Sequence, residues 1–331
     1  MRLLTATLLM CLAATAAADY SHRPEVPALL STLRQDYGFS ERELAGVSDA
    51  LADAQKLPKL VEQEQKAPEK TETWTQYARR IDEARVLGGV QALRDYAPAF
   101  ARAEEDFGVP PPVVAAILGV ETRYGRVTGK VRVLDALATQ GFDHPTRSRF
   151  FMGELAQFFA FCRDFGYDPR APLGSYAGAM GAAQFMPSNY RRLALDYDGN
   201  GRRDLWTLPD AIGSIANYFV NFRPGQSWRR GEPLAVPARL RAALPASIAR
   251  NGHATAYTVD ELAKAGVVTD VDLPGDLRVG LVELPLDNGV EYWLALHNFY
   301  TVMTYNPRIF YAMAVTQLAQ RIQQQSEAPP P

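Results

Sequence analysis

The sequence predicts an α+β fold that is predominantly helical, and three local patterns support this expectation. First, Ser40 followed by Glu43 is a capping-box pattern, and the helix that it starts continues with an apolar face of Leu44, Val47 and Leu51. Second, residues 310–324 return to a helical pattern after a mixed region. Third, a β-hairpin is indicated by the turn Asp287-Asn288-Gly289 between two candidate strands, residues 277–286 and 290–296.

The first eighteen residues have the pattern of an export signal rather than of a folded element. A positive start at Arg2 precedes a leucine-rich apolar stretch, and alanines at 16–18 supply a small-residue cleavage site. The apolar stretch is shorter than the roughly 20 residues of a membrane span. The residues before Cys11 lack the small side chains that lipoprotein processing prefers. We therefore expect cleavage after Ala18, a soluble periplasmic product and no lipid anchor.

Changes in composition divide the rest of the chain into four predicted domains or parts. Residues 19–108 are helical in pattern, with a charged, Gln-rich connection at 58–73. Residues 109–223 are denser in glycine, alanine and aromatic side chains. Residues 224–298 form a small β-containing domain, and residues 299–331 return to the main body through a helix before a proline tail.

Composition narrows the classes of function. The 331-residue chain is 47% apolar and 22% charged, with a net charge of −2 and a pI of about 6.1. This balance suits a globular protein and provides no polybasic field for nucleic acid or anionic lipid. Without residues 1–18 the one cysteine is Cys162, which excludes an internal disulfide and a multi-cysteine zinc site. We expect a monomer and a neutral or locally recognised substrate.

Glu121 is the candidate catalytic residue because it lies at the end of an apolar helix face. Prolines at 110–112 favour a helix start, and the face leading to Glu121 consists of Val114, Ile117 and Leu118. Burial raises the pKa of a carboxyl group, and a general acid must stay protonated near neutral pH. The alternative, which is commoner for glutamates, is an outward-facing side chain that is ion-paired with Arg123 or Arg126.

The glycine- and alanine-rich segment 174–188 is a candidate binding segment. Small residues allow a backbone to approach a ligand, and its N–H and C=O groups suit the acetamido and hydroxyl groups of a sugar. Its polar side chains include Ser175 and Gln184. The spacing around Ser175 is not that of a nucleophile elbow, and the segment has no phosphate-loop lysine. Tight helix packing through small residues is an equally weighted alternative.

Residues 196–210 match an EF-hand calcium loop with a modified end. The pattern Asp-x-Asp-x-Asn-Gly gives expected ligands at Asp196, Asp198, Asn200 and the Arg202 carbonyl. Position twelve is Thr207 rather than glutamate, and Asp210 in the following helical turn is the candidate for the missing carboxylate. Because all these ligands are oxygens, the site favours calcium over zinc or copper. The alternative is an unliganded polar turn.

Tyrosines are dense between residues 298 and 311, at Tyr300, Tyr305 and Tyr311. Tyrosine rings pack on sugars while their hydroxyl groups form hydrogen bonds, although an ordinary aromatic core is the alternative. The four histidines of the chain show no metal-ligand spacing. No second acid lies near Glu121 in the sequence, so a glycosidase with paired carboxylates is not indicated.

Together these segments resemble the membrane-bound lytic transglycosylase B family over roughly residues 75–320. The matching strings occur in the family's order: Gly119-Val-Glu-Thr-Arg-Tyr-Gly125, Leu134-Asp-Ala-Leu-Ala-Thr139, Gly174-Ser-Tyr-Ala-Gly-Ala-Met-Gly181, Gln184-Phe-Met-Pro-Ser188, Asp210-Ala-Ile-Gly-Ser-Ile-Ala-Asn-Tyr218 and Tyr305-Asn306.

The resemblance implies a goose-type-lysozyme-like catalytic core with an EF-hand-like loop, flanked by a helical domain and a small β domain. It implies that Glu121 is the catalytic acid/base, that calcium is a structural ion and that no organic cofactor is needed. The positions implied for the glycan groove are Ser175, Gln184, Tyr218, Tyr305, Asn306 and Tyr311. The calcium ligands implied are Asp196, Asp198, Asn200, Arg202 (by its carbonyl) and Asp210.

Two departures from the family pattern are visible. Many relatives carry a lipobox cysteine, which leaves membrane attachment of this chain unsupported. Phe150 stands where some members have tyrosine, so a hydrogen bond at that position is lost or replaced.

The reaction that the resemblance implies is cleavage of the β-1,4 bond between N-acetylmuramic acid and N-acetylglucosamine without water, which leaves 1,6-anhydro ends. The expected partners are peptidoglycan glycan strands, with other cell-wall enzymes as further candidates. Two alternatives stay open: a hydrolytic muramidase, and a non-catalytic scaffold that binds peptidoglycan.

Overall fold

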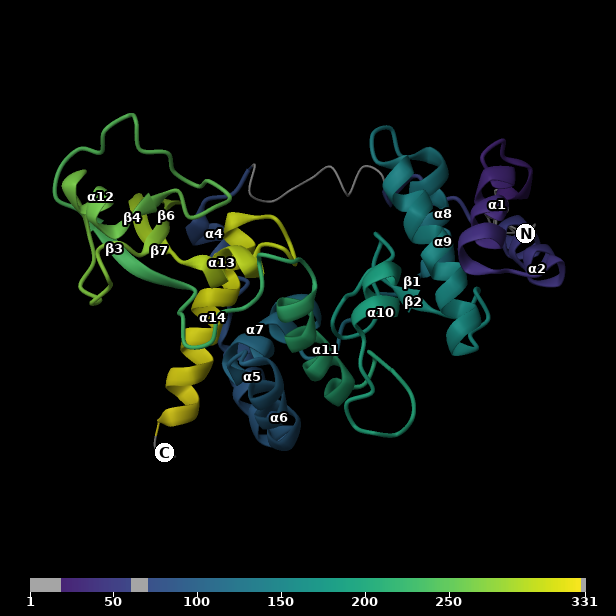
Figure 1. Cartoon of the computed structure of the whole chain (residues 1–331), viewed down its shortest axis with the longest axis horizontal. Coiled ribbons are helices and arrows are strands. Elements are labelled where there is room, and N and C mark those ends of the chain that lie inside the picture. The colour runs from purple at the N-terminus through teal and green to yellow at the C-terminus, as the bar shows by residue number, and fades with distance from the viewer. Residues whose placement is uncertain (1–18, 61–70, 329–331) are drawn as a thin grey trace, which may run out of the picture.

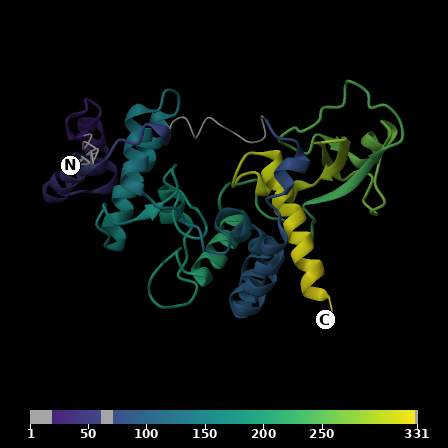
Figure 2. The same ribbon diagram turned by 180° about the vertical axis from the view of Figure 1, so that it is seen from behind.

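The computed structural model describes residues 19–60 and 71–328. The predicted export signal at 1–18, residues 61–70 of the predicted connection and the end of the proline tail at 329–331 lie outside the described residues. The described chain is mainly helical and contains two small antiparallel sheets, which confirms the predicted α+β class. The molecule is elongated, with the first helices at one end and the larger sheet at the other (Figures 1 and 2).

The N-terminal helices pack at one end of the molecule. They are the short 3-10 helix η1 (Tyr20–His22), α1 (Val26–Tyr37) and α2 (Glu41–Asp53). The capping box at the start of α2 is confirmed, because Ser40 and Glu43 bond each other's backbone N–H groups through their side chains. Helix α1 packs on α9 (Ser148–Phe165), which pairs with α8 (Val133–Asp143).

Helix α7 (Pro111–Thr122), which carries Glu121, is surrounded by a second group of helices. Its neighbours are α5 (Glu83–Asp95), α6 (Ala97–Phe107), α11 (Leu208–Asn221) and α14 (Ile309–Glu327). All residues from Val114 to Leu118 are fully buried. The sequence predicted a single apolar face, whereas the structure leaves this stretch of α7 no solvent-facing side. The difference arises because α14, which is distant in sequence, packs along it.

The β-containing region is one five-stranded antiparallel sheet in the order β4-β6-β7-β3-β5. The strands are β3 (Ala235–Leu240), β4 (Tyr257–Thr258), β5 (Val267–Val268), β6 (Arg278–Leu286) and β7 (Gly289–Ala295), with the short helix α12 (Val259–Lys264) between β4 and β5. The predicted hairpin is confirmed: Leu286 pairs with Gly289, whose φ of 106° suits glycine alone.

The two faces of this sheet contribute to two different cores. Leu281 and Leu294 belong to a small local cluster that also contains Leu262 of α12. Val282 and Trp293 face the opposite way and join the main helical core. The sheet is therefore attached to the helices through one apolar face, where α4 (Trp74–Ala78) packs on β6; α13 (His297–Val302) follows β7 directly in the chain.

Apart from the long helices α8 and α9, the segments between α7 and α11 contain only short hydrogen-bonded elements. A two-residue ladder joins β1 (Val131–Arg132) to β2 (Leu173–Gly174), and the short helix α10 (Pro187–Leu193) packs on α9. Among residues 19–60 and 71–328, no helix is both long and apolar enough to cross a membrane.

Candidate active site

Glu121 occupies the last turn of α7, and the chain leaves this helix through a fixed turn. Arg123, Tyr124 and Gly125 all have positive φ, of 50°, 62° and 77°. Two of these are not glycine, so the turn needs outside support. Tyr124 provides it, because its hydroxyl group donates to the Arg85 carbonyl and a Cβ on Gly119 would lie 2.6 Å from its hydroxyl oxygen. The string from Gly119 to Gly125 thus fixes where the helix ends.

The carboxyl group of Glu121 lies in a largely apolar setting and has one hydrogen-bond partner in the structure. The Tyr311 hydroxyl of α14 donates to Glu121 Oε1 at 2.6 Å. Burial raises the pKa of Glu121 from 4.5 to about 7, although the Tyr311 hydrogen bond opposes part of this rise. No arginine contributes to this pKa, so the ion pair with Arg123 or Arg126 that the sequence left open is not formed. Glu121 is therefore able to act as an acid near neutral pH.

Three tyrosines surround this carboxyl group. The pKa of Tyr218, of Tyr305 and of Tyr311 is raised mainly by burial and further by the negative charge of Glu121. The rings of Tyr218 and Tyr305 lie 4.7 Å apart, and the Tyr218 hydroxyl group donates to the Thr304 carbonyl at 2.7 Å. The predicted aromatic residues are thus brought together with Glu121 from α11, from the turn before α14 and from α14 itself.

A loop at residues 181–185 is held against the end of α7 by side chains from three parts of the chain. Thr122 donates through its hydroxyl group to the Ala182 carbonyl at 2.9 Å, and Tyr305 donates to the Ala183 carbonyl. Gln184, with a φ of 51°, donates through Nε2 to the carbonyl groups of Thr128 at 3.1 Å and Gly181 at 2.9 Å. Thr122 was not among the predicted site residues, although it is buried and adjoins Glu121.

Ser175 and Asn306 are partly exposed and have mainly local contacts. The Ser175 hydroxyl oxygen accepts from the N–H groups of Ala177 at 3.3 Å and Ala179 at 3.0 Å, which closes the turn after β2. Asn306 follows Tyr305 directly, and its carbonyl accepts from Arg308. The glycines of this region contact protein rather than open space: a Cβ on Gly174 would lie 2.3 Å from the Ala179 carbonyl oxygen. Close packing, the alternative that the sequence left open, accounts for this glycine.

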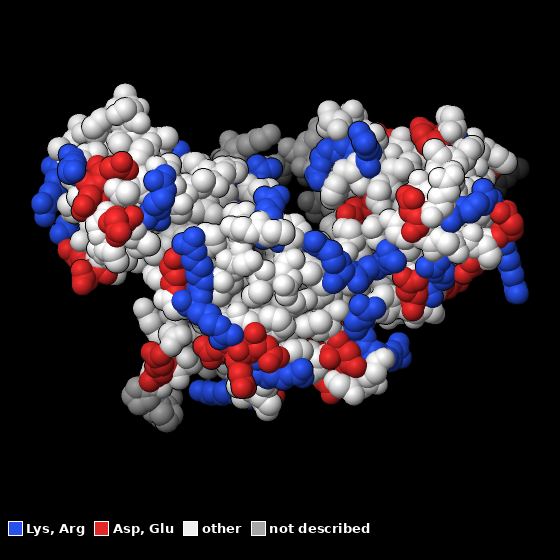
Figure 3. Space-filling model, viewed as in Figure 1, with Lys and Arg blue, Asp and Glu red and all other residues white. Residues whose placement is uncertain are grey.

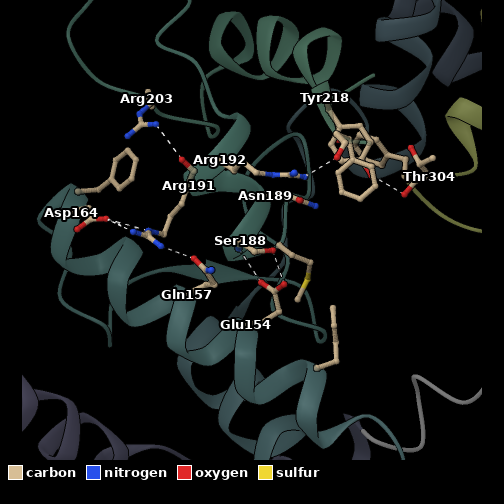
Figure 4. A pocket seen from close by; sticks show the side chains of 15 residues that line it. Glu154, Gln157, Asp164, Ser188, Asn189, Arg191, Arg192, Arg203, Tyr218 and Thr304 are labelled. Atoms are coloured by element: carbon tan, nitrogen blue, oxygen red, sulfur yellow. Dashed lines mark hydrogen bonds and ion pairs between the residues drawn. The ribbon is translucent and has the colours of Figure 1, made fainter. Parts of the chain in front are cut away.

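A cavity of about 810 Å³ adjoins the tyrosines (Figure 4). Its size is within the range of small-molecule sites in proteins. Its lining comes from α9, α10, α11, the loop between α10 and α11, and the turn before α14. The lining residues are Phe150, Glu154, Gln157, Asp164, Phe165, Met186, Ser188, Asn189, Arg191, Arg192, Arg203, Tyr218, Phe222, Thr304 and Tyr305. Tyr218 and Tyr305 thus belong both to the surroundings of Glu121 and to this cavity.

The predicted metal loop brings three carboxylates together. Oxygen atoms of Asp196, Asp198 and Asp210 lie within 4.8 Å of one another. Asp210 is fully buried and accepts from the backbone N–H groups of Tyr197 at 2.7 Å, Asp198 at 3.2 Å and Asp204 at 2.7 Å. Asn200 lies in the same loop and donates to Asp198 Oδ2 at 2.9 Å.

These residues fit a calcium ion by donor chemistry. The cluster presents hard oxygen donors only, which calcium prefers. The hydroxyl group of Thr207, at position twelve of the loop, donates to the Asp204 carbonyl at 2.8 Å, so this side chain serves the turn. Asp210 lies three residues later in the first turn of α11, and its carboxylate lies in the cluster with those of Asp196 and Asp198.

Comparisons with known proteins identify the family. A family model described as "Transglycosylase SLT domain" matches residues 21–320. The chain is 38% identical over 315 residues to membrane-bound lytic murein transglycosylase B of Escherichia coli (strain K12), covering 92% of this chain and 84% of that protein. The structure of the Escherichia coli lytic transglycosylase Slt35 in complex with calcium is 37% identical, with a TM-score of 0.82 and coverage of 93% of this chain and 95% of that chain.

A third relative has been solved with a glycan fragment. SltB3 from Pseudomonas aeruginosa in complex with NAG-anhNAM-pentapeptide is 29% identical, with a TM-score of 0.75 and coverage of 90% of this chain and 79% of that chain. These matches extend over nearly all of the described residues and confirm the family resemblance and the lysozyme-like fold. The chain belongs to the membrane-bound lytic murein transglycosylase B family and is a lytic murein transglycosylase that acts on peptidoglycan.

Proposed function

We propose that Glu121 is the single catalytic acid/base of a non-hydrolytic cleavage between N-acetylmuramic acid and N-acetylglucosamine. The observation that carries this proposal is the environment of its carboxyl group. Burial raises its pKa to about 7, and among the described residues the only side chain that hydrogen-bonds to it is Tyr311. In the part of the chain that the structure describes, no other carboxylate contributes to that pKa, which argues against a pair of acids working at close range.

In the proposed reaction, protonated Glu121 donates its proton to the glycosidic oxygen, and the N-acetylglucosamine leaving group departs with it. The 2-acetamido group of the muramyl residue stabilises the cationic anomeric carbon, so that no second carboxylate is required. The muramyl 6-hydroxyl oxygen then bonds to that carbon. Its proton goes to the Glu121 carboxylate, which restores the acid. The product is a 1,6-anhydro ring, in agreement with the anhNAM unit bound by SltB3.

Six further residues are proposed to bind the sugars. Tyr218 and Tyr305 supply ring faces beside the cavity, and Tyr311 holds Glu121 in place. Gln184 keeps the 181–185 loop in register with the end of α7. Ser175 and Asn306 are proposed to supply polar groups at the rim, which their partial exposure supports.

Digestion of purified peptidoglycan followed by mass spectrometry of the muropeptides tests the reaction. Anhydro products, each one water lighter than a reducing end, are expected from the wild type. Products with reducing ends would show a hydrolytic muramidase instead. Glu121→Gln should bind strands without cleaving them, and Glu105→Gln, which changes an exposed glutamate of α6, should cleave normally. A wild type that binds strands but releases nothing would support the scaffold alternative.

We also propose that calcium is a structural ion held by Asp196, Asp198, Asn200, the Arg202 carbonyl and Asp210. The carboxylate cluster and the calcium complex of Slt35 support this assignment. The ion would brace the loop between α10 and α11, and thereby the position of Tyr218 on α11. Chelation should lower the melting temperature, and an unchanged melting temperature would end the assignment.

Periplasmic localisation is a further proposal, based on the pattern of residues 1–18, and a monomeric state is proposed with it. The proposed partners are peptidoglycan strands and other cell-wall enzymes. The domain boundaries at 108, 223 and 298 are retained as proposals. Fractionation of cells that express the full chain checks the localisation, because a lipid-anchored protein would stay with the membranes.

A further inference from the structure

The cavity beside Tyr218 contains more positive charge than binding of neutral sugars requires. Three arginines line it, and one of them is neutralised. Arg191 bonds Asp164 Oδ2 through Nε at 3.1 Å and Nη2 at 2.9 Å, and it bonds Gln157 Oε1 through Nη1 at 2.6 Å. Asp164 also pairs with Arg163 at 2.8 Å. Both of its carboxylate oxygens are therefore engaged by Arg163 and Arg191.

The other two arginines are oriented without being neutralised. Arg192 donates to the Phe222 carbonyl at 3.2 Å and lies over the Phe222 ring at 5.2 Å. Arg203 donates to the Arg191 carbonyl at 3.4 Å and lies over the Phe165 ring at 4.6 Å. Within the described part of the chain, neither has a carboxylate within 4.0 Å. Each guanidinium therefore keeps most of its five N–H donors for a ligand.

The remaining acid of the cavity does not offset this charge. Glu154 is 6% exposed, and its carboxylate accepts from Ser188 N at 2.9 Å and Ser188 Oγ at 2.6 Å. Burial raises its pKa, and each of its two carboxylate oxygens accepts a hydrogen bond from Ser188. Lys and Arg side chains also gather on this face of the molecule around α10 (Figure 3). The cavity thus presents uncompensated guanidinium groups of Arg192 and Arg203.

We propose that Arg192 and Arg203 bind carboxylates of the muramyl arm, and in particular those of its stem peptide, while the sugars lie against Tyr218 and Tyr305. This proposal rests on the proposed function. The N-acetyl sugars of a strand are themselves neutral, so its negative charges are on the arm at the muramyl 3-oxygen. Guanidinium groups pair with carboxylates in a two-point geometry.

The stem peptide is favoured over the lactyl carboxylate by the placement of the two side chains. Arg192 extends toward the Tyr218 side of the cavity, and Arg203 lies toward the Asp164 side (Figure 4). An arm with several carboxylates can engage both positions, whereas a lactyl group carries one carboxylate. The cavity volume of about 810 Å³ also accommodates more than a single carboxylate-bearing group.

The test compares two substrates and four variants of the full chain. One substrate is peptidoglycan strands with intact stem peptides, and the other is amidase-treated strands that retain only the lactyl carboxylate. The variants are Arg192→Gln, Arg203→Gln, the double variant, and Arg94→Gln as a matched control on the exposed side of α5. Circular dichroism and melting curves verify that each variant is folded.

For the double variant we expect KM on peptide-bearing strands to rise about tenfold, with kcat and the control unchanged, because charge-assisted hydrogen bonds at a partly solvated site have effects of this order. A rise confined to peptide-bearing strands assigns the ligand to the stem peptide. An equal rise on both substrates keeps the anion site but assigns it to the lactyl carboxylate. An unchanged KM on both substrates overturns the proposal.

A failure of the proposed function is distinguishable from a failure of this inference. If the wild type cleaves neither substrate, the catalytic proposal is wrong. Calorimetry then tests separately whether Arg192 and Arg203 bind the peptide. Titration with a muramyl pentapeptide should show weaker binding to the double variant than to the wild type and to Arg94→Gln. Equal binding to all three proteins would exclude the arginines as the anion site.

Discussion

Replacing Glu121 by glutamine should stabilise the protein, and the gain should depend on pH. A carboxyl group whose pKa is raised in the folded state favours folding at a pH below its unfolded value of 4.5 and opposes it as the pH rises through about 7. Because one pH unit corresponds to about 1.4 kcal/mol, moving the pKa from 4.5 to about 7 costs about 3 kcal/mol of unfolding free energy at alkaline pH. The same cost is below about 1 kcal/mol at pH 5.

Urea unfolding of the wild type and Glu121→Gln at pH 5 and pH 8.5 measures this effect. The stability difference between the two proteins should grow by about 2 kcal/mol from the lower to the higher pH. Glutamine keeps an oxygen that accepts from Tyr311, so the hydrogen bond itself is retained. Glu105→Gln on exposed α6 should show the same difference from the wild type at both pH values. A pH-independent difference for Glu121→Gln would refute the idea that burial controls this carboxyl group.

Three further predictions concern the supports of the site. Tyr311→Phe removes the hydrogen bond that lowers the pKa of Glu121, so the alkaline limb of the pH profile of kcat/KM should move to higher pH. The control is Tyr300→Phe, which removes a buried hydroxyl group that has no hydrogen-bond partner among the described residues and should leave the pH profile unchanged. Thr122→Val should cost about 1–3 kcal/mol of unfolding free energy and lower kcat, because the Ala182 carbonyl loses its hydrogen-bond donor. Thr122→Ser should retain most of the stability and most of kcat. An active, stable valine variant would show that the 181–185 loop is held in another way. Asp210→Asn should abolish the rise in melting temperature that calcium causes, whereas Thr207→Ala should retain that rise. If calcium still raises the melting temperature of Asp210→Asn, the ion binds elsewhere.

Features encoded by neighbouring residues were predictable from the sequence. The capping box of Ser40 and Glu43 and the hairpin turn before Gly289 depend on contacts across two or three positions. The position of Glu121 at a helix end is also local, since the prolines that start α7 and the turn that ends it both lie within a few residues. In such cases the pattern and the structure agree because no distant partner is involved.

Features that depend on distant partners were not predictable. The full burial of α7 requires α14, and the role of Thr122 requires the loop that contains Ala182, which lies sixty residues further along the chain. The sequence around Thr122 does not indicate which carbonyl group its hydroxyl will bond. The glycines of residues 174–181 were ambiguous for a related reason, because close approach to a ligand and close approach to the protein backbone demand the same residue.

The hydrogen bond between Tyr311 and Glu121 joins residues that are 190 positions apart, and this separation has a consequence for the order of events during synthesis. A nascent chain presents α7 long before α14 exists, so the acid is complete only after nearly the whole polypeptide has emerged. Until α14 packs, Glu121 lies in water with the pKa of an ordinary glutamate and stays ionised at neutral pH. In the proposed reaction, the partly made protein therefore lacks the protonated Glu121 that begins glycan cleavage. Because Tyr311 follows Glu121 by 190 positions, the raised pKa of Glu121 is established only late in synthesis.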